Sequence, residues 1–172
     1  CIRDSDTGVF KHSNTGKRTM ELTGQLMEKG IPFSKIIDES FYQKTYKQLQ
    51  IMGRCLLESV RVMDGQCIFC VVPKWIMDFY GAKPSDLSGV IDELRTTEGV
   101  EVAIVITERD TSEYKVSMRS NHVVDVSRIA TFFGGGGHIR AAGCEMRGSA
   151  FDVINNLTEH REKQLGSGGA AE

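Results

Sequence analysis

Four consecutive glycines stand directly before a histidine in this sequence: Gly134, Gly135, Gly136, Gly137 and His138. Glycine loses more backbone entropy on folding than any other residue, so such a run within a folded domain needs a compensating role. Backbone without side chains can approach a ligand closely, and successive N–H groups in a turn form a concave site for anions such as phosphate. Histidine adds a donor that can be positively charged near neutral pH. The run predicts a phosphate or nucleotide site, and the alternative is a tight structural turn.

A second group of candidate ligand-binding residues precedes the glycines. Strand alternation places Lys115, Ser117 and Arg119 on one face and Val116 and Met118 on the other. Cationic and hydroxyl donors suit phosphate oxygens, and an arginine can bind them with two parallel hydrogen bonds. The alternative is an ordinary solvent-facing strand, which the sequence favours if this segment is taken alone. Together with the glycine run downstream, the segment predicts a ligand site.

Asp6 is the candidate metal ligand, because an aspartate at a strand end is a good oxygen ligand for a hard cation. One carboxylate does not make a metal site, and in isolation Asp6 is typical of a turn residue. Cys67 and Cys70 form a C-x-x-C pair within an apolar segment that reads as a strand. Residues three apart on a strand point to opposite faces, so we expect two buried thiols and no shared metal ion.

Composition excludes some classes of function. The chain has 172 residues, a formal net charge of −2 and a sequence pI of about 6.1. A protein that coats duplex nucleic acid non-specifically would be strongly basic. No apolar run approaches the roughly 18 residues of a membrane span, and no signal segment opens the chain. We therefore expect a cytoplasmic protein that does not associate with a membrane.

Hydrophobic periodicity and turn residues predict an α/β fold, a mixed β-sheet flanked by helices. Strands are expected at 66–73, 100–107, 114–119 and 143–147. Helices are expected at 17–29, 32–40, 42–60, 74–80, 85–96 (beginning at a Ser85 cap), 125–133 and 149–165, with a loop at 109–113. The resulting division is 1–40, the tail of a truncated α/β domain; 41–63, a connector helix; 64–165, a compact domain; and 166–172, a disordered tail.

The motifs together resemble the DHH phosphoesterases. Segment 6–15 (DTGVFKHSNT) resembles the last metal-binding motif of that family. The DHH-associated C-terminal domain is resembled by four segments in order: 99–103 (GVEVA), 115–120 (KVSMRS), 124–126 (VDV) and 134–143 (GGGGHIRAAG). Within the family, the nanoRNase/pAp-phosphatase branch is the most similar, and the resemblance covers nearly all of residues 6–160.

This resemblance implies a two-lobed phosphoric ester hydrolase that acts on short oligoribonucleotides or 3'-phosphoadenosine 5'-phosphate (pAp). Two metal ions, usually Mn²⁺, would activate water, with Asp6 as one ligand. Arg119, Ser120, the glycine run and His138 would hold the substrate, and helix 42–60 would connect the lobes. The Asp-His-His motif itself is absent, so we expect a fragment that binds nucleotide without hydrolysing it. The resemblance also allows a homodimer through the missing domain.

Three alternatives remain open at this stage. A cyclic-dinucleotide phosphodiesterase of the same superfamily would usually carry membrane and sensory segments upstream. A non-catalytic nucleic-acid-binding appendage, like that of alanyl-tRNA synthetases, would have no reason to keep Asp6. The last alternative is an α/β domain without a ligand.

Overall fold

The computed structural model describes residues 9–10, 15–87 and 89–166, with side chains through residue 159. The chain divides into two compact units, residues 1–45 and 46–172. Asp6 and Cys1 lie outside the described residues, as does the expected tail beyond Gly166. No described helix is both long and apolar enough to cross a bilayer.

The first unit is helical in its described part. It contains α2 (Lys17–Glu28), α3 (Phe33–Ile37) and the π-helical turn η1 (Asp38–Tyr42). Gly30, in the left-handed region at φ 77°, follows the end of α2 and makes the turn toward α3. No described residue of this unit is buried.

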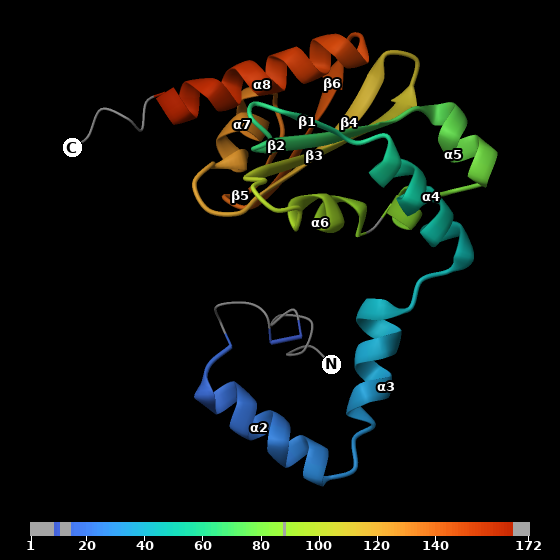
Figure 1. The fold of residues 1–172 in the computed structure, drawn as a ribbon, viewed down its shortest axis with the longest axis vertical. Coiled ribbons are helices and arrows are strands. Elements are labelled where there is room, and N and C mark those ends of the chain that lie inside the picture. Colours follow the sequence, from blue (N-terminus) through green and yellow to red (C-terminus); the bar gives the residue numbers. More distant parts are fainter. Residues whose placement is uncertain (1–8, 11–14, 88, 167–172) are drawn as a thin grey trace. The chain divides into compact units, whose positions relative to one another are not determined.

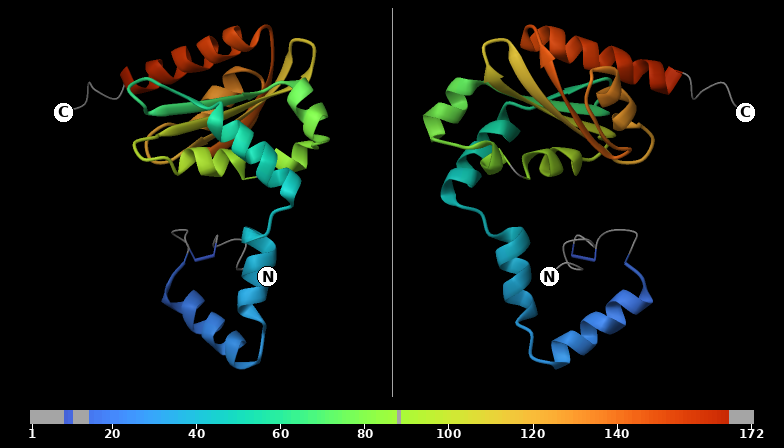
Figure 2. Two further views of the ribbon diagram at one scale, coloured as in Figure 1. Left: turned by 45° about the vertical axis from the view of Figure 1, so that its right-hand side comes forward. Right: turned by 180° about the vertical axis from the view of Figure 1, so that it is seen from behind.

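The second unit is built on a six-stranded mixed sheet of order β1-β2-β3-β4-β6-β5 (Figures 1 and 2). The strands are β1 (Val60–Val62), β2 (Cys67–Val72), β3 (Val102–Asp110), β4 (Glu113–Ser120), β5 (Gly136–His138) and β6 (Ala141–Arg147). β2 and β3 are parallel, and the other neighbours are antiparallel. The mixed α/β class expected from the sequence is confirmed.

Helices cover the sheet on both faces. They are α4 (Tyr46–Leu57), α5 (Lys74–Tyr80), the 3-10 turn η2 (Pro84–Leu87), α6 (Val90–Arg95), α7 (Val126–Phe132) and α8 (Ala150–Gly166). Figure 1 shows α7 and α8 on one face and α4 and α6 on the other. Each face therefore has its own hydrophobic cluster, as expected of a layered α/β domain.

The two clusters divide the sheet unequally. The cluster under α7 and α8 draws on β2, β3, β4 and β6. The cluster under α4, α5 and α6 draws on β2 and β3 but takes no described residue from β4, β5 or β6. On the second face, the half of the sheet formed by β4, β6 and β5 therefore contributes nothing to the apolar core. Cys67 belongs to the first cluster and Cys70 to the second, which confirms that these thiols point to opposite faces and cannot share a metal ion.

Three expectations about the elements were wrong. The helix expected over 42–60 begins only at Tyr46, because Gln43 is extended, and it ends at Leu57, since Val60 already begins the edge strand β1. The helix expected over 85–96 is interrupted: η2 ends at Leu87, and α6 begins after Gly89, whose φ of 90° is left-handed. Ser85 therefore caps nothing. The loop expected over 109–113 is mostly strand.

Candidate phosphate-binding face of the sheet

β4 presents its cationic face to the uncovered half of the sheet. Val116 and Met118 are buried beneath α7 and α8, whereas Lys115 is exposed and Ser117 and Arg119 are half-buried. The period-2 alternation expected for this strand is confirmed. Among the described residues, the side chains of Lys115 and Ser117 make no hydrogen bond or ion pair, and that of Arg119 donates only to its neighbour, the Met118 carbonyl (3.1 Å). These donors are available to a ligand.

Strand register brings His138 onto the same face as Arg119. Arg119 pairs with Ala141 on β6, and Ala141 pairs with His138 on β5. Directly paired residues point to the same side of a sheet, and neighbouring strands are about 4.8 Å apart. The guanidinium and the imidazole therefore stand on one face about two strand spacings, or roughly 10 Å, apart. In this row of paired residues, only the Ala141 methyl group lies between them.

The next row on this face carries even less side chain. Ser117 pairs with Gly143, and Gly143 pairs with Gly136. A Cβ at Gly136 would meet nothing within 4 Å, so the space above it is open. The result is a floor of bare backbone and one methyl group, bordered by Arg119, Ser117 and His138. A ligand can approach the backbone closely here.

The glycine run itself does not form the anion nest expected from the sequence. Gly134 has φ 75° and follows α7, where its N–H donates to the Thr131 carbonyl (3.0 Å) and that of Gly135 to the Ala130 carbonyl (2.8 Å). This is the Schellman arrangement, in which a left-handed glycine closes a helix C-terminus. These two N–H groups are used by the helix and cannot also bind phosphate. The remaining two glycines continue as the edge strand β5.

Two of the four glycines are needed for packing. A Cβ on Gly135 would lie 2.2 Å from the Gly143 carbonyl oxygen, and one on Gly137 would lie 2.5 Å from the Ala141 oxygen. Gly137 also has φ 147°. The structural alternative raised for the run therefore accounts for Gly134, Gly135 and Gly137, and Gly136 is the one that opens onto the floor.

Ser120 lies away from this face, contrary to expectation. It is buried, with 3% of its surface exposed, and its hydroxyl donates to the Val124 carbonyl (2.7 Å). A second, longer contact of 3.4 Å joins it to the Ile139 carbonyl in the β5–β6 turn. Because Ser120 follows Arg119 on the strand, it points to the opposite side. Its hydroxyl holds the hairpin and has no route to a ligand on the Arg119 face.

The connection from β4 to α7 is held by two charged side chains that the sequence did not identify. The Glu101 carboxylate accepts the backbone N–H groups of residues 122, 123 and 124, at distances from 2.6 to 3.1 Å. Arg140 donates to the carbonyls of His122 and Val124, the latter at 3.0 Å. Charge-assisted hydrogen bonds of this kind are stronger than neutral ones. Through Arg140 the β5–β6 turn is tied to this loop, which helps to fix His138 relative to Arg119.

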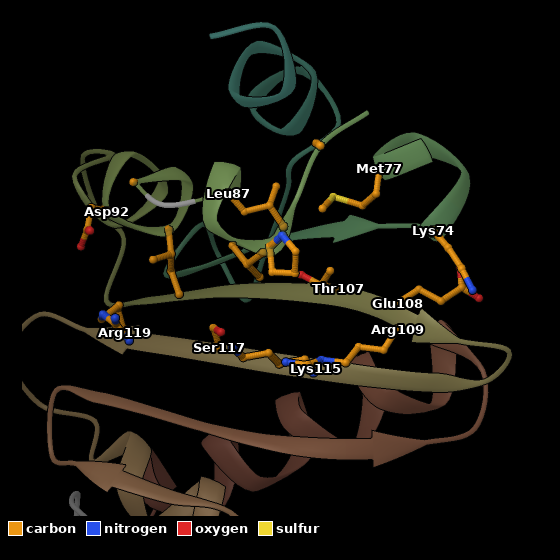
Figure 3. A pocket seen from close by; sticks show the side chains of 15 residues that line it. Lys74, Met77, Leu87, Asp92, Thr107, Glu108, Arg109, Lys115, Ser117 and Arg119 are labelled. Atoms are coloured by element: carbon orange, nitrogen blue, oxygen red, sulfur yellow. The ribbon is translucent and has the colours of Figure 1, made fainter. Parts of the chain in front are cut away.

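A cavity of about 440 Å³ lies beside the cationic strand, between the sheet and the α5–η2–α6 segment (Figure 3). Its lining includes Lys115, Ser117 and Arg119, which were expected as ligand residues, and the charged or polar side chains of Lys74, Asp92, Thr107, Glu108 and Arg109, which were not. The four basic and two acidic residues of the lining give a local net charge of +2, in a chain whose formal charge is −2. A positive hollow in a slightly acidic protein favours an anionic ligand.

The unexpected lining residues left only weak signals in the sequence. Lys74 and Arg109 each stand near the end of a predicted strand, where many surface residues are charged, and Asp92 lies on a predicted helix. Only the parallel pairing of β2 with β3 brings Val72 beside Thr107, and so Lys74 near Glu108 and Arg109. Pairing between distant strands does not follow from local periodicity.

The described residues contain no group of three or more His, Cys, Asp or Glu side chains able to hold a metal ion. Asp6, the expected metal ligand, lies outside the described residues, so its role stays a prediction. The four described cysteines, Cys55, Cys67, Cys70 and Cys144, are buried and form no disulfide with one another.

Comparison with known proteins agrees with this architecture. A bifunctional oligoribonuclease and PAP phosphatase NrnA of Thermus thermophilus is 28% identical over 149 residues, which are 86% of this chain and 44% of that protein. An A-adding tRNA nucleotidyltransferase of Aquifex aeolicus is 25% identical over 154 residues, covering 88% of this chain and 18% of that protein. The chain therefore spans less than half the length of these curated relatives.

The fold recurs in a solved structure of an exopolyphosphatase-related protein from Bacteroides fragilis. It superposes with a TM-score of 0.86 at 24% identity, covering 94% of this chain and 47% of that one. The model of the DHHA1 domain matches residues 65–164, which include the whole sheet from β2 onward, the cationic strand and the glycine hairpin. This chain belongs to the DHHA1 domain family, the DHH-associated domain that its motifs resembled.

Proposed function

We propose that this chain is the substrate-binding half of a metal-dependent phosphoesterase that hydrolyses short oligoribonucleotides, pAp or both. The observation that carries the proposal is the juxtaposition of Arg119 and His138 on one open sheet face, with a backbone floor between them. The name of the Thermus thermophilus relative supports the same substrate class.

The residues suggest how a nucleotide would be held. The Arg119 guanidinium has donors left to grip a phosphate with two parallel hydrogen bonds. The Ser117 hydroxyl and the His138 imidazole supply further donors at the border of the floor. A sugar or base would lie over Gly136 and Gly143, where no side chain intervenes.

Hydrolysis would need a DHH-containing segment in addition to the residues described here. In such an enzyme, Asp6 of this chain would supply one ligand of a two-metal Mn²⁺ site, and the DHH-containing segment would supply the other ligands. Such ions lower the pKa of bound water and neutralise charge on the phosphoryl oxygens. The chain would bind and orient the substrate, and by itself would hydrolyse nothing. We place the protein in the cytoplasm, with a homodimer formed through the DHH segment.

Calorimetric titration of the 172-residue chain with pAp tests the binding role. We expect saturable binding that Arg119→Ala or His138→Ala weakens by about 1–3 kcal/mol, since each removes a hydrogen-bond donor to a charged phosphate. That corresponds to roughly 5- to 150-fold in Kd. Arg128→Gln is a matched control, because Arg128 is exposed on α7 across the sheet. If neither variant differs from this control, the site is misplaced.

A second candidate is a nucleic-acid-binding appendage without a catalytic role. This candidate is supported by the match to a tRNA nucleotidyltransferase, because that protein has a different named activity and acts on a nucleic acid. Joining the chain to the DHH segment of a close relative separates the two candidates. The phosphoesterase proposal expects Mn²⁺-dependent release of mononucleotides from a short oligoribonucleotide by the joined protein and none by the chain alone. Release by the chain alone would contradict the division of roles proposed here.

A further inference from the structure

The binding mode proposed above, through Arg119, Ser117 and His138, does not use two cations at the far end of the cavity. Arg109, at the end of β3, and Lys115, on β4, are both exposed and both line the cavity. Figure 3 shows the Lys115 side chain extended toward Arg109 and away from Arg119. Neither side chain makes a hydrogen bond or an ion pair within the described part of the chain. Two like charges that converge without a partner repel each other, and an anion between them would relieve that repulsion.

None of the nearby described carboxylates forms an ion pair with Arg109 or Lys115. Glu108 accepts the backbone N–H of Lys74 (2.9 Å), and Asp110 lies 3.9 Å from the ammonium of the same lysine. Glu145 is the cross-strand partner of Lys115 but forms no ion pair with it within 4.0 Å. Asp92 lies toward the Arg119 end and contacts Arg95 at 3.8 Å.

The distance between the two cationic ends sets the length of ligand that can reach both. Lys115 and Arg119 are four residues apart on β4, which at 3.3 Å per residue is about 13 Å. A polypeptide residue contributes three backbone bonds and at most about 3.6 Å. Six bonds join neighbouring phosphorus atoms of a nucleic acid, so by the same arithmetic one extended step is about 7 Å. Because the Lys115 side chain points away from Arg119, the two cationic ends are at least two phosphate steps apart.

We propose that Arg109 and Lys115 form a second phosphate subsite, which binds the phosphate two steps along the strand from the one held by Arg119. The ligand is a single-stranded oligonucleotide with at least three phosphates. A bisphosphate such as pAp is too short to engage both subsites. This inference rests on the function proposed above, because it takes Arg119 as the first subsite.

Two ligands that differ by one nucleotide test it: pAp, with two phosphates, and pApAp, with three. We expect the 172-residue chain to bind pApAp at least tenfold more tightly, because one further charge-assisted contact contributes about that much. The double variant Arg109→Gln/Lys115→Gln should lose roughly tenfold for pApAp and leave pAp within about twofold. The salt dependence of pApAp binding should fall by about 0.7 in log–log slope for each lost contact. The single variant Lys115→Arg keeps the charge and should bind pApAp in preference to pAp, as the wild type does. Arg128→Gln is again the control.

The outcomes separate the two proposals. If the double variant weakens pAp and pApAp equally, or neither, the second subsite does not exist, while the dependence of pAp on Arg119 still supports the proposed function. If the wild-type chain binds neither ligand, or Arg119→Ala changes nothing, the proposed function itself fails. Tighter binding of inorganic tripolyphosphate than of pApAp would overturn the oligonucleotide assignment in favour of a polyphosphate ligand, whose phosphates are closer together.

Discussion

Replacing Gly137 by alanine should separate the packing role of the glycine run from its role in ligand binding. The new Cβ would lie 2.5 Å from the Ala141 oxygen and 2.6 Å from the Ala142 Cα, both of them backbone atoms. It would also occupy φ 147°, which L-residues rarely adopt. Backbone strain of that kind costs about 1–3 kcal/mol, and forced overpacking about as much again. We expect a loss of roughly 2–6 kcal/mol in the free energy of unfolding.

Gly136→Ala is the matched control, one residue away in the same strand. Its Cβ would meet nothing within 4 Å and its φ is not left-handed, so stability should stay within about 0.5 kcal/mol of wild type or rise slightly. That methyl group would stand on the floor beside Gly143, however, and should weaken pAp binding. Urea unfolding followed by circular dichroism gives the stabilities, and calorimetry gives the affinities. Equal free energies of unfolding for the two variants would contradict the close packing of Gly137 against the Ala141 and Ala142 backbone.

Two further predictions concern pH. The Ser127 hydroxyl and the nearby backbone N–H groups lower the pKa of Asp125, the N-cap of α7. This cap therefore stabilises the fold above the ordinary aspartate pKa of about 3.9 and loses its effect as pH falls below that value. The free energy of unfolding of wild type should decline between about pH 4 and pH 2, and Asp125→Asn should flatten that decline. Burial raises the pKa of the Cys144 thiol to about 11, so the folded state favours the neutral thiol. The free energy of unfolding should therefore fall from about pH 8.5 toward pH 11, by up to about 3 kcal/mol. If urea titrations show the whole decline in Cys144→Ala as well, this prediction is contradicted.

Local pattern was enough to predict most of the second unit. β2 and β3 are nearly continuous apolar runs because helices pack on both of their faces, and β4 alternates because only one of its faces joins the apolar core. The same alternation correctly placed Lys115, Ser117 and Arg119 on one face and separated Cys67 from Cys70. Where side-chain direction depends only on strand geometry, the prediction held.

Features that depend on distant contacts were not predictable in this way. The glycine run is compatible with a nest, a turn or an edge strand, and only pairing with β6 selects the strand. Ser120 was misassigned for a different reason: the resemblance grouped it with Arg119, although strand alternation alone turns its side chain to the opposite face. The clamp formed by Glu101 and Arg140 on the 121–124 loop joins residues about forty positions apart, and no local signal marks it.

The bare floor between Arg119 and His138 also limits which features of a bound nucleotide the protein can recognise. Recognition of a particular base needs donors or acceptors aimed at its edge, and Gly136, Gly143 and Ala141 have no polar side-chain atoms to supply them. A nucleotide lying there would be held by its charge and by contact with its flat surface, so adenine, uracil, guanine and cytosine would be accepted alike.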